Sequence, residues 1–220
     1  MSTQPRLTDR DIGAAMEREL KMALEGSTDL EKILKRLPKP EEIVEQRNHY
    51  FVDPPMLLSS VGMMVRVREE RSPDAPTPHL VILTLKRRVS ASDGVFVAHE
   101  EETLLDHSDW AEVQSGDRDL VSLPCDALKG IRDLGVSRLD VRGTMVNLRR
   151  KISLGGFLLE VDQTTFPNGV VDSEIEVETD RPEEARAMLE EVAREVGITL
   201  RVQTRGKYGR LLKHLERSGQ

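Results

Sequence analysis

The chain has 220 residues, of which 38% are hydrophobic, 32% are charged and 3% are aromatic, and its net charge is −7. The acidic balance and the scarcity of aromatic side chains argue against binding to DNA or RNA, which requires a broad basic surface or stacking platforms. The single cysteine excludes a disulfide framework and a cysteine-based zinc site, and no apolar run is long enough to span a membrane. With no signal peptide visible, we expect a cytoplasmic protein that does not contact a membrane.

The length fits one domain, and its boundaries follow from changes in composition. Residues 1–14 are polar and are expected to form an N-terminal extension to a single domain at 15–215. Helical spacing of apolar residues predicts a helix over 28–37, and a proline near its first turn begins another through about residue 196. Glycines, a proline and scattered acids at 105–135 predict a helical insertion with loops.

Several short runs alternate apolar and polar residues with period two, which is typical of strands. These runs lie at residues 64–68, 79–88, 95–102, 142–154, 156–164 and 172–179. Asp93-Gly94 predicts a hairpin turn, and a final strand and a basic tail follow the last helix. In all, about eight antiparallel strands with a few helices predict an α+β fold built on a closed or nearly closed β-barrel.

Charges of one sign recur at alternate positions of the predicted strands, and therefore share a strand face. They are Arg66 and Arg68, Lys86 and Arg88, Glu100 and Glu102, and Glu174, Glu176 and Glu178. A solvated face would be the ordinary explanation of any one such strand. Three carboxylates in a line repel one another, however, unless cations face them. Basic and acidic strands in one small barrel therefore suggest an interior that binds a polyanion together with divalent metal.

The N-terminal segment contains the spacing Glu17-x-Glu19-x-Lys21, which has two readings. Its neighbours are strong helix formers, and on a helix Glu17 and Lys21 would pair while Glu19 points away. On a strand all three side chains would share one face.

E-x-E-x-K near the N-terminus resembles the signature of the CYTH, or triphosphate tunnel metalloenzyme, family. Later segments resemble the family in the same order: Gln46 to Asp53, Arg66-Val67-Arg68, Leu83-Thr84-Leu85-Lys86, Glu100 with Glu102, Asn147-Leu148-Arg149, Leu159 to Asp162, Glu174 to Glu178, and Gly206-Lys207-Tyr208. The resemblance covers about residues 16–213 and is closest to the short, single-domain inorganic tripolyphosphatase branch.

The sequence departs from the family pattern in three places. Val97 stands where the family often has an arginine before its paired acids. The family's Asp-Thr-Pro appears here as the shifted segment Val52-Asp53-Pro54-Pro55, and the E-x-E-x-K motif begins late.

The resemblance implies an eight-stranded antiparallel barrel enclosing a tunnel, in which metal-activated water hydrolyses inorganic tripolyphosphate to pyrophosphate and phosphate. One or two Mg²⁺ or Mn²⁺ ions would be held by Glu17, Glu19, Glu176 and Glu178, with Glu174 pointing the same way. Phosphates would be bound by Arg66, Arg68, Lys86, Arg88, Arg149 and Lys207. Glu17 or Glu19 would accept the proton of water, and Lys21 would position that water or contact phosphate. Glu100 and Glu102 would orient the arginines, and Glu160 and Asp162 would lie in the tunnel wall.

Other functions remain open on the same fold: a thiamine triphosphatase, a class IV-like adenylyl cyclase, or a non-catalytic polyphosphate-binding module. The few aromatic residues argue against recognition of thiamine or adenine. The carboxylates argue for catalysis, because simple polyanion binding needs only the basic residues. We therefore expect an inorganic triphosphatase with a small-molecule triphosphate substrate, as a monomer or homodimer.

Overall fold

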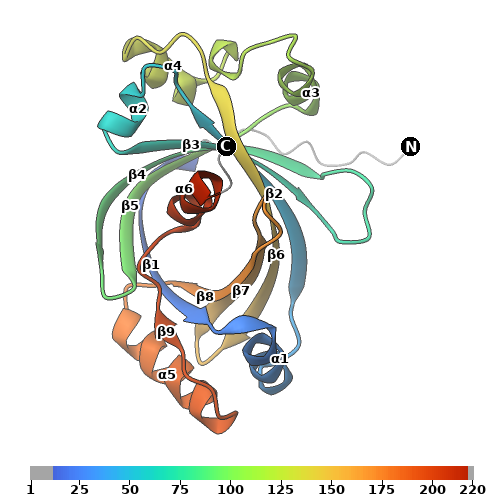
Figure 1. Ribbon diagram of the computed structural model, residues 1–220, viewed down its shortest axis with the longest axis vertical. Helices are drawn as coiled ribbons and strands as arrows, with labels where there is room; N and C mark the ends of the chain where they lie inside the picture. The colour runs from blue at the N-terminus through green and yellow to red at the C-terminus, as the bar shows by residue number, and fades with distance from the viewer. Residues whose placement is uncertain (1–11, 218–220) are drawn as a thin grey trace.

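The computed structural model describes residues 12–217, and its central feature is a closed β-barrel (Figure 1). Its strands are β1 (Ile12–Leu24), β2 (Glu42–Val52), β3 (Met63–Arg71), β4 (Leu80–Ser92), β5 (Val95–Leu104), β6 (Asp140–Leu154), β7 (Phe157–Thr165) and β8 (Val171–Glu178). They pair antiparallel in the order β5-β4-β3-β2-β6-β7-β8-β1, and pairing of β1 with β5 closes the ring. The short β9 (Arg201–Val202) pairs with one end of β1. The predicted barrel is confirmed.

The N-terminal motif lies on a strand and not on a helix. β1 pairs with β5 through residues 12–20 and with β8 through residues 19–24, so it is the strand that closes the barrel. Backbone pairing on both sides overrides the helix propensity of the segment, since propensity is a weak preference that tertiary context outweighs. Glu17, Glu19 and Lys21 consequently share one face, and all three line the barrel interior.

Two expectations about the strands need correction. β2 is a full strand, although residues 42–52 were not among the runs predicted to be strands. Its interior positions hold the polar Gln46 and Asn48, which hide the usual apolar alternation. The expected final strand, β9, is only two residues long, and the basic tail after it forms the helix α6 (Lys207–Arg217).

The helices lie mainly outside the barrel. They are α1 (Gly26–Arg36), α2 (Leu57–Ser60), α3 (His107–Ser115), the short 3-10 helix η1 (Leu120–Ser122), α4 (Asp126–Asp133), α5 (Pro182–Glu195) and α6. The helices predicted near 28–37 and 182–196 are α1 and α5, which begin and end within about two residues of the expected positions. α3, η1 and α4 lie within 105–135. Most of the predicted extension at 1–14 falls outside the described residues.

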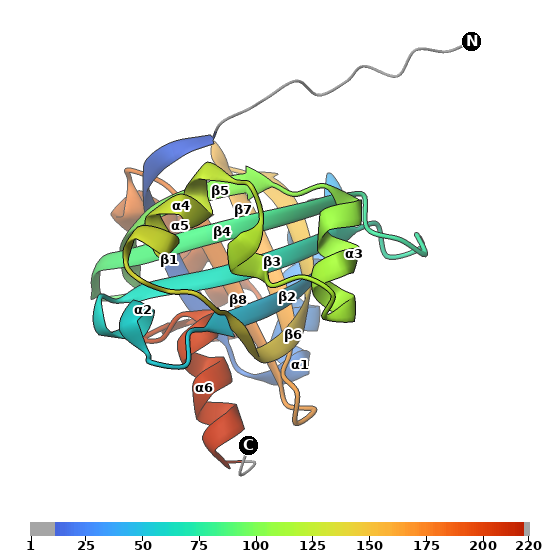
Figure 2. The same ribbon diagram turned by 90° about the horizontal axis from the view of Figure 1, so that it is seen from above.

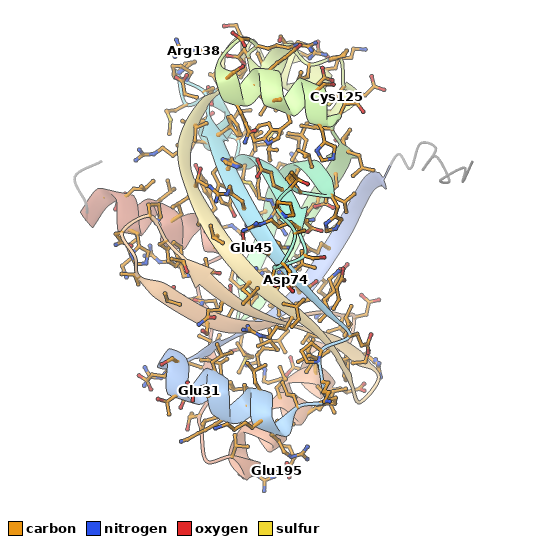
Figure 3. The ribbon with its side chains drawn as sticks, turned by 90° about the vertical axis from the view of Figure 1, so that its right-hand side faces the viewer. Glu31, Glu45, Asp74, Cys125, Arg138 and Glu195 are labelled. Carbon is orange, nitrogen blue, oxygen red and sulfur yellow. The ribbon has the colours of Figure 1, made fainter. Side chains whose placement is uncertain are left out.

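The hydrophobic core covers the outer surface of the barrel. One cluster joins α1 and α5 to apolar residues of β1, β7 and β8, such as Leu20, Leu159 and Ile175. A second joins α3, η1 and α4 to β3 and β4 (Figure 2). Figure 3 shows the two layers at opposite ends of the molecule, with Glu31 and Glu195 at one end and Cys125 and Arg138 at the other.

The barrel interior is polar because strand side chains alternate between the two faces. On β8, Ile175 and Val177 are fully buried in the outer cluster, whereas Glu174 and Glu176, which are 1% and 2% exposed, point inward. Packing helices on the outside therefore frees the interior for charged side chains.

The turn between β4 and β5 has the predicted hairpin form. Asp93 and Gly94 both have positive φ, 49° and 75°, which suits a two-residue turn of the type that follows strand twist. The Gly94 carbonyl accepts a 2.8 Å hydrogen bond from the Lys21 amide, so the turn is tied to β1. Among the described residues, no helix is both long and apolar enough to cross a membrane.

Candidate active site

The barrel encloses a cavity of about 550 Å³, lined by residues from most of its strands and by α6. All but one of the residues predicted to act in catalysis, metal binding or phosphate binding line it; these are Glu17, Glu19, Lys21, Arg66, Arg68, Lys86, Arg88, Arg149, Lys207 and Glu176. The exception is Glu178, which is exposed at the end of β8. The one-face charge pattern therefore correctly predicts which side of most strands faces the interior.

Arg66 and Arg68 on β3 are held by Thr84 of β4 and by acids of β5 and of β3 itself. Arg66 donates to Thr84 at 3.1 Å and lies 3.6 Å from Glu100. Arg68 pairs with Glu70 at 2.9 Å and with Glu102 at 3.2 Å. These contacts keep both guanidinium groups directed into the cavity.

Lys86 on β4 reaches acids of β1 and β5 with its ammonium group. Its ammonium pairs with Glu17 and, at 2.6 Å, with Glu100. Arg88, two residues further along β4, also lines the cavity but is exposed. Val97, where the family often has an arginine, contributes an apolar stretch of wall.

Arg149 on β6 reaches the opposite, acidic wall. It forms a bidentate pair with Asp162 at 2.9 and 2.6 Å, donates to Glu176 at 2.6 Å and also pairs with Glu160. Lys207, the first residue of α6, lies 2.8 Å from Asp162 and 2.6 Å from Glu176.

In the part of the chain that the structure describes, two groups of carboxylates are close enough to share an ion. Within each group one oxygen per residue lies within 4.8 Å of the others, and the groups are Glu19, Glu160 and Glu176, and Asp162, Glu174 and Glu176. Glu176 belongs to both. The donors are carboxylate oxygens on rigid strands, the ligand type that Mg²⁺ and Mn²⁺ prefer. The residues present therefore fit a divalent metal.

Of the four predicted metal ligands, the structure brings together only Glu19 and Glu176. Glu17 lies instead with Lys86 and Glu100. Glu174 and Glu176 take the inward places on β8, and Glu178 lies beyond them. Strand alternation puts Glu174, Glu176 and Glu178 on one face, but it does not say which of them reach the middle of the barrel.

The acids of this wall have pKa values shifted in opposite directions: that of Glu19 is raised, whereas those of Glu174 and Glu176 are lowered. Burial, together with the nearby Glu176 carboxylate, raises the pKa of Glu19 to about 8, although Lys21 opposes the shift. Burial also tends to raise the pKa of Glu174, but Lys207 and Arg210 outweigh it and lower the value to about 2. Glu176 is held well below its ordinary pKa, against burial, by Lys207, Lys21 and Arg149.

Sequence reasoning missed four residues of the cavity region. Arg210 is 7% exposed and binds Glu174 through two hydrogen bonds; it lies one helical turn after Lys207, a spacing that helix phasing reveals once α6 is recognised as a helix. Tyr50, Phe96 and Tyr208 line the cavity. Tyr50 and Tyr208 stack with ring centroids 5.0 Å apart. The low aromatic content gave no sign that three aromatic rings line one cavity.

The two glutamates at the end of β8 provide a direct test of this geometry. Glu176→Gln should weaken Mn²⁺ binding at least about tenfold, since even indirect supports of a metal typically change affinity by that factor. Glu178→Gln should change it less than about twofold. Calorimetric titration with Mn²⁺, with thermal unfolding as a check on folding, measures both variants. Equal losses would show that Glu178 is a ligand, as the sequence predicted.

Comparisons with known proteins agree with this architecture. An adenylyl cyclase candidate from Hippeastrum, HpAC1, for which a dominant triphosphatase activity is described, is 26% identical, with a TM-score of 0.80 over 93% of this chain and 96% of that chain. An adenylate cyclase candidate from Bacillus halodurans is 24% identical, with a TM-score of 0.66 over 89% of this chain and 97% of that one. PH1819 from Pyrococcus horikoshii is 20% identical, with a TM-score of 0.58 over 89% of this chain and 99% of that one.

The last two similarities show a shared fold. None of the curated proteins compared with the chain matches it. The model of the CYTH domain matches residues 15–204, which span nearly the whole barrel and its covering helices. On this match and on its closed barrel, the chain belongs to the CYTH domain family.

Proposed function

We propose that this protein is a metal-dependent phosphohydrolase that removes the terminal phosphate of inorganic tripolyphosphate, giving pyrophosphate and phosphate. The observation that supports it is the pairing, inside one cavity, of partly buried cations with Glu19, Glu160 and Glu176, whose carboxylates can hold metal. The second metal-capable group adjoins this one through Glu176. A site that only bound a polyanion would not need the carboxylates. The triphosphatase activity described for HpAC1 is in line with this chemistry.

The cations bind the phosphates. Arg66, Arg68 and Arg149 present planar forks that match two phosphate oxygens at once, and Lys86 adds a point charge. Each is already fixed by an acidic neighbour, so little side-chain entropy is lost when the substrate enters.

Glu19, Glu160, Glu176, Asp162 and Glu174 hold the metal. When bound, it neutralises charge on the phosphate oxygens and lowers the pKa of a coordinated water. We assign the role of base to Glu19, which accepts the proton of the attacking water, because its carboxylate belongs to the metal-capable group beside Glu160 and Glu176. Lys21, which lies 2.5 Å from Glu19, holds that carboxylate in place.

An organic triphosphate is the second candidate, because Tyr50, Phe96 and Tyr208 line the cavity. Aromatic rings favour a thiazolium or a nucleobase. Tyr50 is 2% exposed, however, and its ring is stacked on Tyr208, which leaves it little free face for a ligand. Tripolyphosphate, which has no ring to place, is therefore favoured.

The experiment is phosphate release from tripolyphosphate, thiamine triphosphate and ATP side by side, with Mg²⁺, with Mn²⁺ and with chelator. We expect metal-dependent release that is fastest from tripolyphosphate. Faster release from thiamine triphosphate or ATP would assign the aromatic residues to substrate recognition. Tight tripolyphosphate binding without any release would make the protein a binding module.

The raised pKa of Glu19 also predicts how stability depends on pH. The folded protein keeps the Glu19 proton up to about pH 8, whereas the ordinary pKa is 4.5, so folding binds a proton between these values. The free energy of unfolding contributed by this group therefore falls as pH rises through that window. Glu19→Gln has no proton to lose. With chelator present, we measure the melting temperature of Glu19→Gln and subtract that of the wild type. This difference should become more positive as the pH rises from about 5 to about 8.

Glu25→Gln, at the exposed position directly after β1, is the matched control, and its melting temperature minus that of the wild type should not change with pH. If the melting temperature of Glu19→Gln minus that of the wild type is also independent of pH, the pKa of Glu19 is not raised.

A further inference from the structure

α6 carries two cations into the acidic wall. Lys207 begins the helix and Arg210 follows one turn later, so both point to the same side. Both bind Glu174: Lys207 at 2.8 Å, and Arg210 through two hydrogen bonds of 2.6 and 2.8 Å. Their other contacts differ, and this difference suggests different roles.

The Lys207 ammonium lies where a metal would bind. It is 2.8 Å from Asp162, 2.8 Å from Glu174 and 2.6 Å from Glu176, the three carboxylates of one metal-capable group. A divalent ion held by these oxygens would need about 2.0–2.2 Å to each of them. An ammonium and a divalent ion cannot both occupy that position, because they would be in contact and would repel each other.

Arg210 binds at the edge of the group. It reaches Glu174, lies 3.3 Å from Asp172 and donates to the Arg205 carbonyl at 3.0 Å, where the chain enters α6. Within residues 12–217, it makes no hydrogen bond or ion pair with Asp162 or Glu176. Its contacts with Glu174 Oε2, Asp172 and the Arg205 carbonyl do not use Glu174 Oε1, the oxygen that Lys207 contacts. These contacts therefore remain when the centre of the group changes its occupant.

Apolar contacts also hold α6 to the barrel. Leu211 and Leu215 are 0% and 4% exposed and pack with Tyr50, Met145 and Phe166. At Gly143 on β6 an added Cβ would lie 3.1 Å from Leu215, so the helix approaches the strand closely at this point. Figures 1 and 2 show α6 at one mouth of the barrel, from which it projects outward.

We propose that metal entering the Asp162–Glu174–Glu176 group displaces the Lys207 ammonium, which then turns to the substrate phosphates, while Arg210 is the positioning residue that keeps α6 docked. Lys207 thus leaves its carboxylate partners and contacts phosphate instead. The substrate is therefore bound by all of the cations, Lys207 included, only after metal has bound. The proposal rests on the proposed function for its phosphate step. The displacement step concerns this chain and metal alone.

The displacement is tested with Mn²⁺ in the absence of substrate. Lys207→Met removes the competing charge and keeps the length of the side chain, so calorimetry should show Mn²⁺ binding at least about tenfold tighter than in the wild type. Lys213→Met, at an exposed position on the same helix, is the matched control and should leave the affinity unchanged. Unchanged or weaker Mn²⁺ binding in Lys207→Met would overturn the proposal.

The role of Arg210 is tested by hydrogen exchange of the α6 amides. In the wild type, Mn²⁺ should leave α6 protected, because Arg210 still binds Glu174. In Arg210→Met, Mn²⁺ should speed exchange at least about fivefold, because the metal also removes the Lys207 contact. Arg210→Lys should restore part of the protection. Equal effects of Mn²⁺ on the wild type and Arg210→Met would overturn the positioning role.

Both measurements separate this proposal from the proposed function, because neither requires turnover. If no triphosphate is hydrolysed but Lys207→Met binds Mn²⁺ more tightly, the function fails and the displacement stands. If tripolyphosphate is hydrolysed, Lys207→Met should raise KM for it even though metal binds more tightly. An unchanged KM would overturn the phosphate step.

Discussion

Three cations meet at Glu176. This carboxylate is 2% exposed and binds Lys21, Arg149 and Lys207 at once. A carboxylate buried to this degree stays ionised only where such partners surround it. Each of the three cations also contacts a further acid, so the acidic wall of the barrel interior is one connected network. Removing a single member would leave a buried charge without compensation, which is costly.

This network determines how the rest of the molecule is built. Because the interior is occupied by charge, the apolar face of each strand must point outward, and helices must cover it. α1 and α5 cover β1, β7 and β8, while α3 and α4 cover β3 and β4. Closure of β1 on β5 leaves the barrel without an open edge. The carboxylates, arginines and lysines are thus fixed by strand pairing before any ligand enters, which is the arrangement that favours catalysis by positioned charge.

Much of this could be predicted from the sequence, because strand alternation is a local rule. It correctly placed Arg66, Lys86 and Glu176 on interior faces. Glu19 was placed there only by the family resemblance, because its neighbours are strong helix formers. Strand alternation could not decide which acids of β8 lie deep in the barrel, since depth depends on strand register and tilt. β2 was missed because its inward residues are polar. Arg210 was missed because the basic tail was not recognised as a helix. Helix phasing puts it on the same side as Lys207, but the acids that this side meets depend on where α6 packs.

Metal and triphosphate are proposed to bind in the same barrel cavity, the metal on its acidic wall and the phosphates on its basic wall. Crystals grown with Mn²⁺ and tripolyphosphate test it most directly, since anomalous scattering locates the manganese. We expect manganese bound by the Glu176 carboxylate, and phosphate oxygens within hydrogen-bond distance of Arg66 or Arg68. Manganese bound outside the cavity, or phosphate away from these arginines, would contradict it.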